Sequence, residues 1–135
     1  MKKGVIKNLL KKIQLDLDSK KNELFQREST LGELLKKLQS SYEKICQEKE
    51  FAKELLNTRG FSEFLNFEKI KQNEIQINIK KTEIEVENFY NELREIFSEQ
   101  KKYEYIAKNI ELEEGKSQER VEREILDNFK NGSVV

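Results

Sequence analysis

Large aliphatic residues recur at intervals of seven along the first part of the chain. The positions are Leu10, Leu17, Leu24, Leu31, Leu38, Ile45 and Ala52, and all but the last are leucine or isoleucine. An interval of seven places these side chains on one narrow stripe of an α-helix, two turns apart. Because such a stripe is unfavourable in water, the pattern predicts a long helix that pairs with another helix.

A second stripe with the same interval starts at residue 61: Phe61, Glu68, Ile75, Thr82, Phe89, Ile96, Tyr103 and Ile110. A short connection makes two long helices antiparallel neighbours. Folding the chain back at Gly60 brings the two stripes into register. The predicted layers are Leu10–Ile110, Leu17–Tyr103, Leu24–Ile96, Leu31–Phe89, Leu38–Thr82 and Ile45–Ile75. The predicted fold class is therefore all-α, with two long helices forming an antiparallel coiled-coil hairpin.

The expected boundaries follow from the residues around Gly60. We predict a single domain over residues 1–135, with helix one at about 5–56, a turn at about 57–62 and helix two at about 63–129. The chain contains no proline, so nothing in it interrupts helices of this length. Gly60 suits the left-handed conformation that ends many helices, and Ser62 is a candidate N-cap for the second helix.

The positions beside the two stripes are less regular. On the first helix we expect Leu35 and Tyr42 to flank the leucine stripe. On the second helix Ile70, Ile77 and Ile84 form an additional stripe, again at intervals of seven. The second helix therefore carries more apolar surface than the first can cover, and a second hairpin could pack there.

The composition fits a long-helix protein rather than a globule. Charged residues make up 39% of the chain and hydrophobic residues 36%, a balance typical of coiled coils. Basic and acidic residues number 26 each, so no net field attracts nucleic acid or an anionic membrane. The lysines ahead of the leucine stripe are too sparse to form the basic region of a leucine-zipper transcription factor.

No catalytic chemistry is recognisable in the sequence. The chain has no histidine, the commonest general base and metal ligand. Cys46 is the only cysteine, which favours a reducing compartment. No window is apolar enough for a membrane span or a signal peptide. We therefore expect a protein that is not an enzyme and that binds no cofactor and no metal.

Two groups of apolar residues exceed what the hairpin can bury. Around the turn, Phe51, Phe64 and Phe67 cannot all face one seam, so some of them should be exposed as a protein-binding surface. At the other end, the predicted register places Met1 level with about residue 119. The segment beyond then has no partner helix, yet it carries an apolar face formed by Val121, Ile125, Leu126 and Phe129. Such a face either frays, dimerises or docks into another protein, and we expect docking, with Arg120, Arg123 and Lys130 at its rim.

The segments GFSEFLNFEKIKQNEI and ERVEREILDNFKN, placed on a long helical hairpin, carry a resemblance to a known family. The first pairs aromatic residues with regularly spaced isoleucines, and the second is a Glu-rich closing segment with a Leu-Asp pair. The chain resembles the FliJ family, the coiled-coil component of bacterial flagellar type III export. Stalk proteins of the related injectisomes share the same plan.

The resemblance implies a non-enzymatic stalk and chaperone in the cytoplasm, peripherally associated with the export apparatus of the inner membrane. Its partners would be the hexameric export ATPase, the cytoplasmic domain of the export-gate membrane protein, and substrate chaperones. By resemblance, the face at Val121, Ile125, Leu126 and Phe129 would meet the ATPase, and Phe51, Phe64 and Phe67 would meet the gate. The alternative is a structural coiled-coil scaffold or oligomerisation protein unrelated to secretion.

Overall fold

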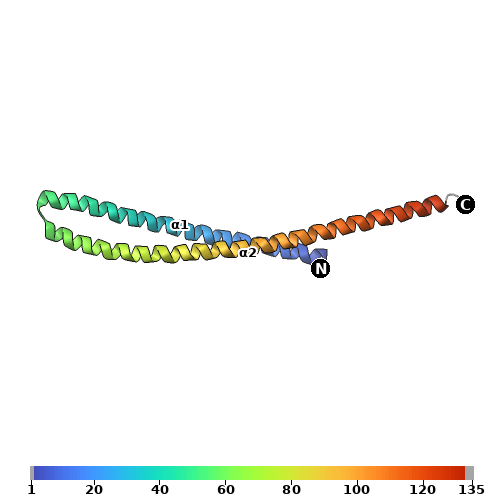
Figure 1. The fold of residues 1–135 in the computed structure, drawn as a ribbon, viewed down its shortest axis with the longest axis horizontal. Coiled ribbons are helices and arrows are strands. Elements are labelled where there is room, and N and C mark those ends of the chain that lie inside the picture. The colour runs from blue at the N-terminus through green and yellow to red at the C-terminus, as the bar shows by residue number, and fades with distance from the viewer. Residues whose placement is uncertain (1, 133–135) are drawn as a thin grey trace. The chain divides into compact units, whose positions relative to one another are not determined.

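The computed structural model describes residues 2–132, and nearly all of them are helical. Helix α1 spans Lys3–Leu55 and helix α2 spans Thr58–Gly132 (Figure 1). The two helices contact each other and run in opposite directions, and the described part of the chain contains no strand. The prediction of an all-α antiparallel hairpin is therefore confirmed.

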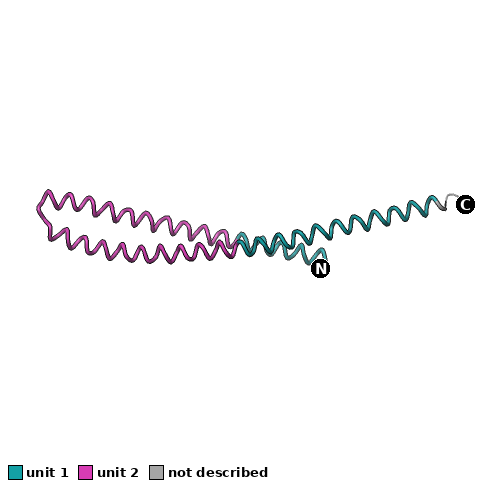
Figure 2. The backbone as a smooth tube through the Cα atoms, viewed as in Figure 1, with its two compact units in different colours: residues 1–18, 94–135 teal, residues 19–93 magenta. Residues whose placement is uncertain are grey.

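The chain divides into two compact units, each built from a piece of both helices (Figure 2). Unit 2 is Ser19–Leu93 and contains the turn. Unit 1 combines the described residues up to Asp18 with those from Arg94 onward. Each unit is described below by itself.

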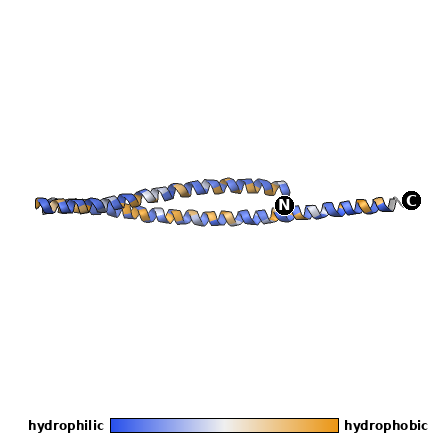
Figure 3. Ribbon diagram, turned by 90° about the horizontal axis from the view of Figure 1, so that it is seen from above, coloured by the Kyte–Doolittle hydropathy of each residue, from blue (hydrophilic) through white to orange (hydrophobic). Residues whose placement is uncertain are grey.

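The apolar core of each unit is a thin line of side chains. In unit 1 Ile6, Ile13 and Leu17 are buried, and Ile6 is only 1% exposed. In unit 2 the buried aliphatic residues are Leu24, Ile75 and Ile79. Elsewhere the helices are mostly polar, with short apolar patches between charged stretches (Figure 3). Among the described residues, the buried aliphatic side chains therefore lie in the seam between the two helices.

A buried polar layer interrupts the seam of unit 2. The Ser41 hydroxyl donates a hydrogen bond to Glu68 Oε2 at 2.6 Å, and Gln72 Nε2 donates to Ser41 Oγ at 3.1 Å. All three residues are buried, and among the described residues no buried side-chain polar atom lacks a partner. A satisfied polar layer in a coiled coil disfavours other alignments, since any shift leaves these groups buried without partners.

Charged contacts across unit 2 repeat the same alignment of the two helices. Lys20 pairs with Glu92 at 3.1 Å, and Arg27 pairs with Glu85 at 3.3 Å. The ammonium group of Lys20 also lies 5.7 Å from the centre of the Phe89 ring. These contacts place Leu24 level with Phe89, which is one heptad away from its predicted partner.

Tyr90 and Glu28 add a further contact across unit 2. The Tyr90 hydroxyl donates a hydrogen bond to Glu28 Oε1 at 2.6 Å. This hydrogen bond, followed by the negative charge of Glu28, raises the pKa of Tyr90 above its usual value. The cause is that ionised Tyr90 would lose the donated proton and face a carboxylate.

Unit 1 shows the same displacement of the register. Gln100 Nε2 donates a hydrogen bond to Gln14 Oε1 at 2.9 Å, and Lys3 pairs with Glu114 at 3.2 Å. Leu17 therefore lies level with Ile96 and not with Tyr103. The predicted register was wrong by seven residues in both units, although the two stripes themselves were identified correctly.

The position of the turn explains this error. Only Leu56 and Asn57 separate the two helices, whereas the predicted turn covered residues 57–62. The chain reverses at Leu56 and Asn57, about half a heptad before Gly60. When a turn moves by half a heptad, each residue of one helix faces a residue of the other helix that is a whole heptad away from its former partner. Since both registers keep the same residues in the seam, the heptad pattern could not distinguish them.

Asn57 and Leu56 make this tight turn possible. The Leu56 amide donates to the Lys53 carbonyl at 3.4 Å and the Asn57 amide to the Ala52 carbonyl at 3.0 Å, the Schellman pattern that closes a helix. Leu56 has a φ of 51°, so a leucine occupies the left-handed position that usually carries glycine.

Asn57 is the N-cap of α2, and Gly60 has a different role from the one predicted. The Asn57 side-chain oxygen accepts a hydrogen bond from the Gly60 amide at 3.1 Å. A Cβ on Gly60 would lie 2.8 Å from the Asn57 side chain. Gly60 therefore leaves room for the capping side chain. It does not adopt a positive φ, and Ser62 is not the cap.

Candidate protein-binding surfaces

The three phenylalanines predicted near the turn lie in unit 2 with different exposure. Phe51 on α1 is 57% exposed and Phe67 on α2 is 65% exposed, whereas Phe64 is half-buried. Phe61, which lies on the seam stripe, is also half-buried and helps to close the end of the hairpin. The tip therefore has more aromatic surface than its own helices cover, but Phe64 contributes only part of its ring.

Two shallow grooves lie at the turn, and both are lined by Ala52 and Phe61. The larger holds about 330 Å³ and is completed by Leu56 and Thr58, with Lys49 and Lys53 among its lining residues. The smaller holds about 190 Å³ and includes Phe51, Leu55 and Glu48. The larger groove is therefore mainly apolar, whereas the smaller one combines apolar and polar groups.

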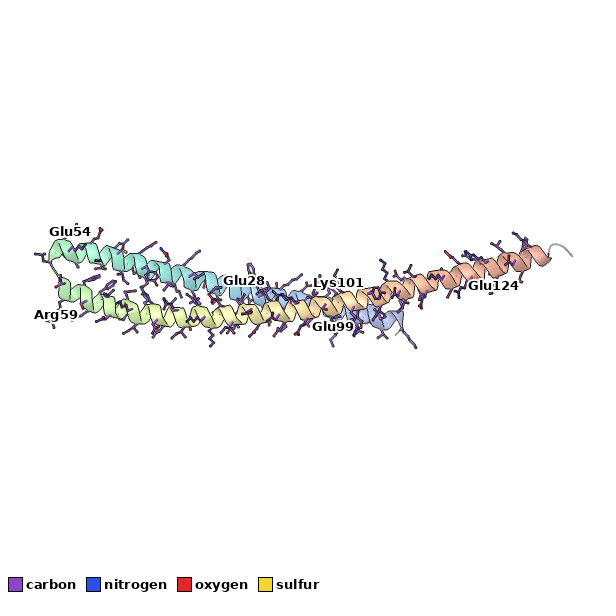
Figure 4. The ribbon with its side chains drawn as sticks, in the orientation of Figure 1. Glu28, Glu54, Arg59, Glu99, Lys101 and Glu124 are labelled. Carbon is purple, nitrogen blue, oxygen red and sulfur yellow. The ribbon has the colours of Figure 1, made fainter. Side chains whose placement is uncertain are left out.

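Leu55 and Leu56 belong to this tip surface, and the sequence pattern did not identify them. Leu55 is 60% exposed and Leu56 is 88% exposed. Leucine at the end of a heptad stripe looks like an ordinary seam residue, so only the position of the turn reveals it. The charged groups nearby extend outward, as the side chains of Glu54 and Arg59 show (Figure 4).

The second candidate surface is the carboxyl-terminal part of α2 in unit 1. Every side chain from Glu111 to Lys130 is exposed, and Lys3, the first residue of α1, pairs with Glu114. The helix nevertheless continues to Gly132. The segment without a partner helix therefore begins earlier than about residue 119, the limit expected from the predicted register.

The predicted apolar face on this segment is present and uncovered. Val121 is 53% exposed, Ile125 61%, Leu126 58% and Phe129 74%. Their spacing places them on one side of α2, and acidic residues such as Glu124 project from the same stretch (Figure 4). A helix with one apolar side and charged flanks is the form in which helical segments dock into grooves of other proteins.

Among the described residues, no group of three or more His, Cys, Asp or Glu side chains could hold a metal ion. Cys46 is exposed and unpaired. Within the described residues, neither α1 nor α2 has a stretch long and apolar enough to cross a membrane. The exposed apolar side chains of both surfaces are suited to binding apolar groups of another protein.

No protein-family model, curated protein or solved structure matches this chain.

Proposed function

We propose that this chain is a non-enzymatic coiled-coil stalk and chaperone that acts in flagellar type III protein export or in a related injectisome. The observation that carries the proposal is the unpaired end of α2, which keeps an apolar face at Val121, Ile125, Leu126 and Phe129 although no helix of its own covers it. In a helix that served only to complete the hairpin, these positions would be polar like their neighbours.

The acceptor in this proposal is the pore of the hexameric export ATPase. A stalk needs no catalytic residue to stimulate such a ring. If the apolar face binds one conformation of the ring more tightly than the others, it shifts the population toward that conformation. The tip surface at Phe51, Phe64 and Phe67 is then available for the cytoplasmic domain of the export gate, and substrate chaperones are further partners. The proposed location is the cytoplasm, at the membrane-embedded export apparatus.

The test is the effect of the chain on ATP hydrolysis by the purified export ATPase. Truncation after Glu119 removes the apolar face and keeps the Lys3–Glu114 contact of unit 1. We expect the full chain to stimulate hydrolysis and hexamer assembly, and the truncated chain to do neither while its remaining helices stay folded.

Point variants separate loss of the face from loss of chain length. Ile125→Gln removes one apolar side chain from the face and should reduce stimulation. Leu15→Gln is the matched control, because Leu15 is 71% exposed in the same unit but lies on α1, away from the face. Equal stimulation by the full and truncated chains would overturn the proposal and leave a structural scaffold as the better description.

A further inference from the structure

Unit 2 carries an apolar stripe that its own hairpin does not use. Ile70, Ile77 and Ile84 are 64%, 59% and 60% exposed. They lie on the side of α2 opposite the seam. Ile75 and Ile79, which are buried in the seam, lie two residues before and two residues after Ile77, and residues two apart point to nearly opposite sides of an α-helix. Positions facing away from a coiled-coil seam are ordinarily charged, so three isoleucines in a row there indicate a second interface.

The spacing of this stripe makes it self-complementary. Ile77 lies in the middle, with identical residues seven positions before and after it. A two-fold axis at Ile77, with the two α2 helices antiparallel, places Ile77 against the same residue of a second copy. The same axis places Ile70 against Ile84 of that copy. An interface in which one patch meets itself is the usual arrangement of homodimers.

The charges beside the stripe favour the antiparallel arrangement. Glu74 and Lys81 lie seven residues apart on one flank of Ile77, and Lys80 lies on the other flank. In the antiparallel pair Glu74 of each copy meets Lys81 of the other, which gives two ion pairs by symmetry. In a parallel pair Lys81 of each copy would instead meet Lys80 of the other. Within the described residues, none of these three groups forms an ion pair in its own chain.

We propose that the stripe formed by Ile70, Ile77 and Ile84 is the interface of an antiparallel homodimer. The contact runs along 14 residues of α2, about 21 Å of helix. It is small compared with the roughly 1,000 Å² that marks a stable interface, so the dimer forms at micromolar or higher concentration and exchanges readily. The inference does not depend on the proposed export function, since it uses only unit 2 and a second copy of the chain.

Sedimentation equilibrium of the full chain, from about 1 μM to about 1 mM, tests the proposal. We expect a monomer–dimer equilibrium that Ile77→Lys abolishes within this range. Lysine is at least as good a helix former as isoleucine, so the exposed substitution should leave the helical content unchanged. Leu15→Lys is the matched control, because Leu15 is 71% exposed on α1 and lies outside the stripe. This control should dimerise like the unaltered chain.

Charge exchange tests the orientation. Glu74→Lys or Lys81→Glu alone should weaken dimerisation about threefold to tenfold, and the double variant should restore it. In a Cys46→Ser background, a mixture of Ile70→Cys and Ile84→Cys chains should form a disulfide more readily than Ile70→Cys alone. A chain that stays monomeric throughout, or a dimer that Ile77→Lys leaves intact, would overturn the inference. A preference of Ile70→Cys for itself would overturn the antiparallel arrangement.

Discussion

Replacing Leu56 by glycine should stabilise unit 2, although the change removes a large apolar side chain. Leu56 is held at a φ of 51°, in the left-handed region, where the Cβ of an L-residue crowds the following carbonyl oxygen. Its side chain is 88% exposed, so it gains little from contact with the rest of the molecule. The hydrogen bonds of the Schellman turn involve only the backbone and remain available to glycine.

The expected change in the free energy of unfolding is the sum of one stabilising and two destabilising effects. Relief of the left-handed conformation contributes about 1–2 kcal/mol. The greater freedom of glycine in the unfolded chain costs about 0.5–1 kcal/mol. Loss of the small buried part of Leu56 costs about 0.2–0.4 kcal/mol, a tenth or so of the value for full burial. The net gain is about 0.5 kcal/mol, which corresponds to a rise in Tm of about 2 °C.

Thermal unfolding followed by far-ultraviolet circular dichroism measures this shift, and urea unfolding provides an independent midpoint. Leu55→Gly is the matched control. Leu55 is the last residue of α1, so glycine there should destabilise the chain by up to about 1 kcal/mol. A lower Tm for Leu56→Gly, comparable with that of Leu55→Gly, would show that Leu56 is not strained in solution. A higher Tm for Leu56→Gly would show that Leu56 lowers the stability of the chain. An exposed, strained leucine that lowers stability is expected where the side chain contacts a partner.

Two further predictions concern the register and the glycines. In a Cys46→Ser background, Leu38→Cys with Ile75→Cys should form a disulfide within one chain, whereas Leu38→Cys with Thr82→Cys should not. Ile75 and Thr82 lie seven residues apart, about 10 Å along the helix, so only one of them can reach Leu38. A disulfide with position 82 in place of position 75 would support the register expected from a turn at Gly60. Gly32→Ala should raise the free energy of unfolding by about 1 kcal/mol, because nothing lies within 4 Å of the added Cβ. Gly60→Ala should lower it, since its Cβ would lie 2.8 Å from the capping side chain of Asn57, and equal effects at the two sites would contradict the assigned N-cap.

The heptad stripes were sufficient to predict the fold class, because apolar residues at intervals of seven are typical of helices that pair with another helix. They were insufficient for the register. The choice between the two alignments depends on Asn57 as N-cap and on a left-handed Leu56. Asparagine is a common N-cap, but leucine is rare at a positive φ and gives no turn signal at its position. The buried layer of Ser41, Glu68 and Gln72 was missed for a related reason, since a search for apolar side chains passes over serine.

The companion positions on α1 show the same limit. Leu35 and Tyr42 were expected to flank the leucine stripe, but they are 50% and 44% exposed. The flanking positions in the structure are Leu34, which is half-buried, and Ser41. Tyr42 is more apolar than Ser41, so the apolar pattern favours the wrong side of the helix there, whereas Leu34 and Leu35 are the same residue type and the pattern cannot separate them. The two candidate surfaces were anticipated because they are excesses of apolar residues, whereas Leu55 and Leu56 became visible only once the turn was located.

Site-specific photocrosslinking at Ile125 in the cell tests the proposed contact between the apolar face at the end of α2 and the export ATPase. A photoreactive amino acid replaces Ile125, which is 61% exposed, and in a parallel strain it replaces Leu15, which is 71% exposed on α1. We expect an adduct between position 125 and the export ATPase, identified by mass spectrometry, and no such adduct from position 15. Adducts from position 125 only with a second copy of the chain, or with proteins outside the export apparatus, would contradict it.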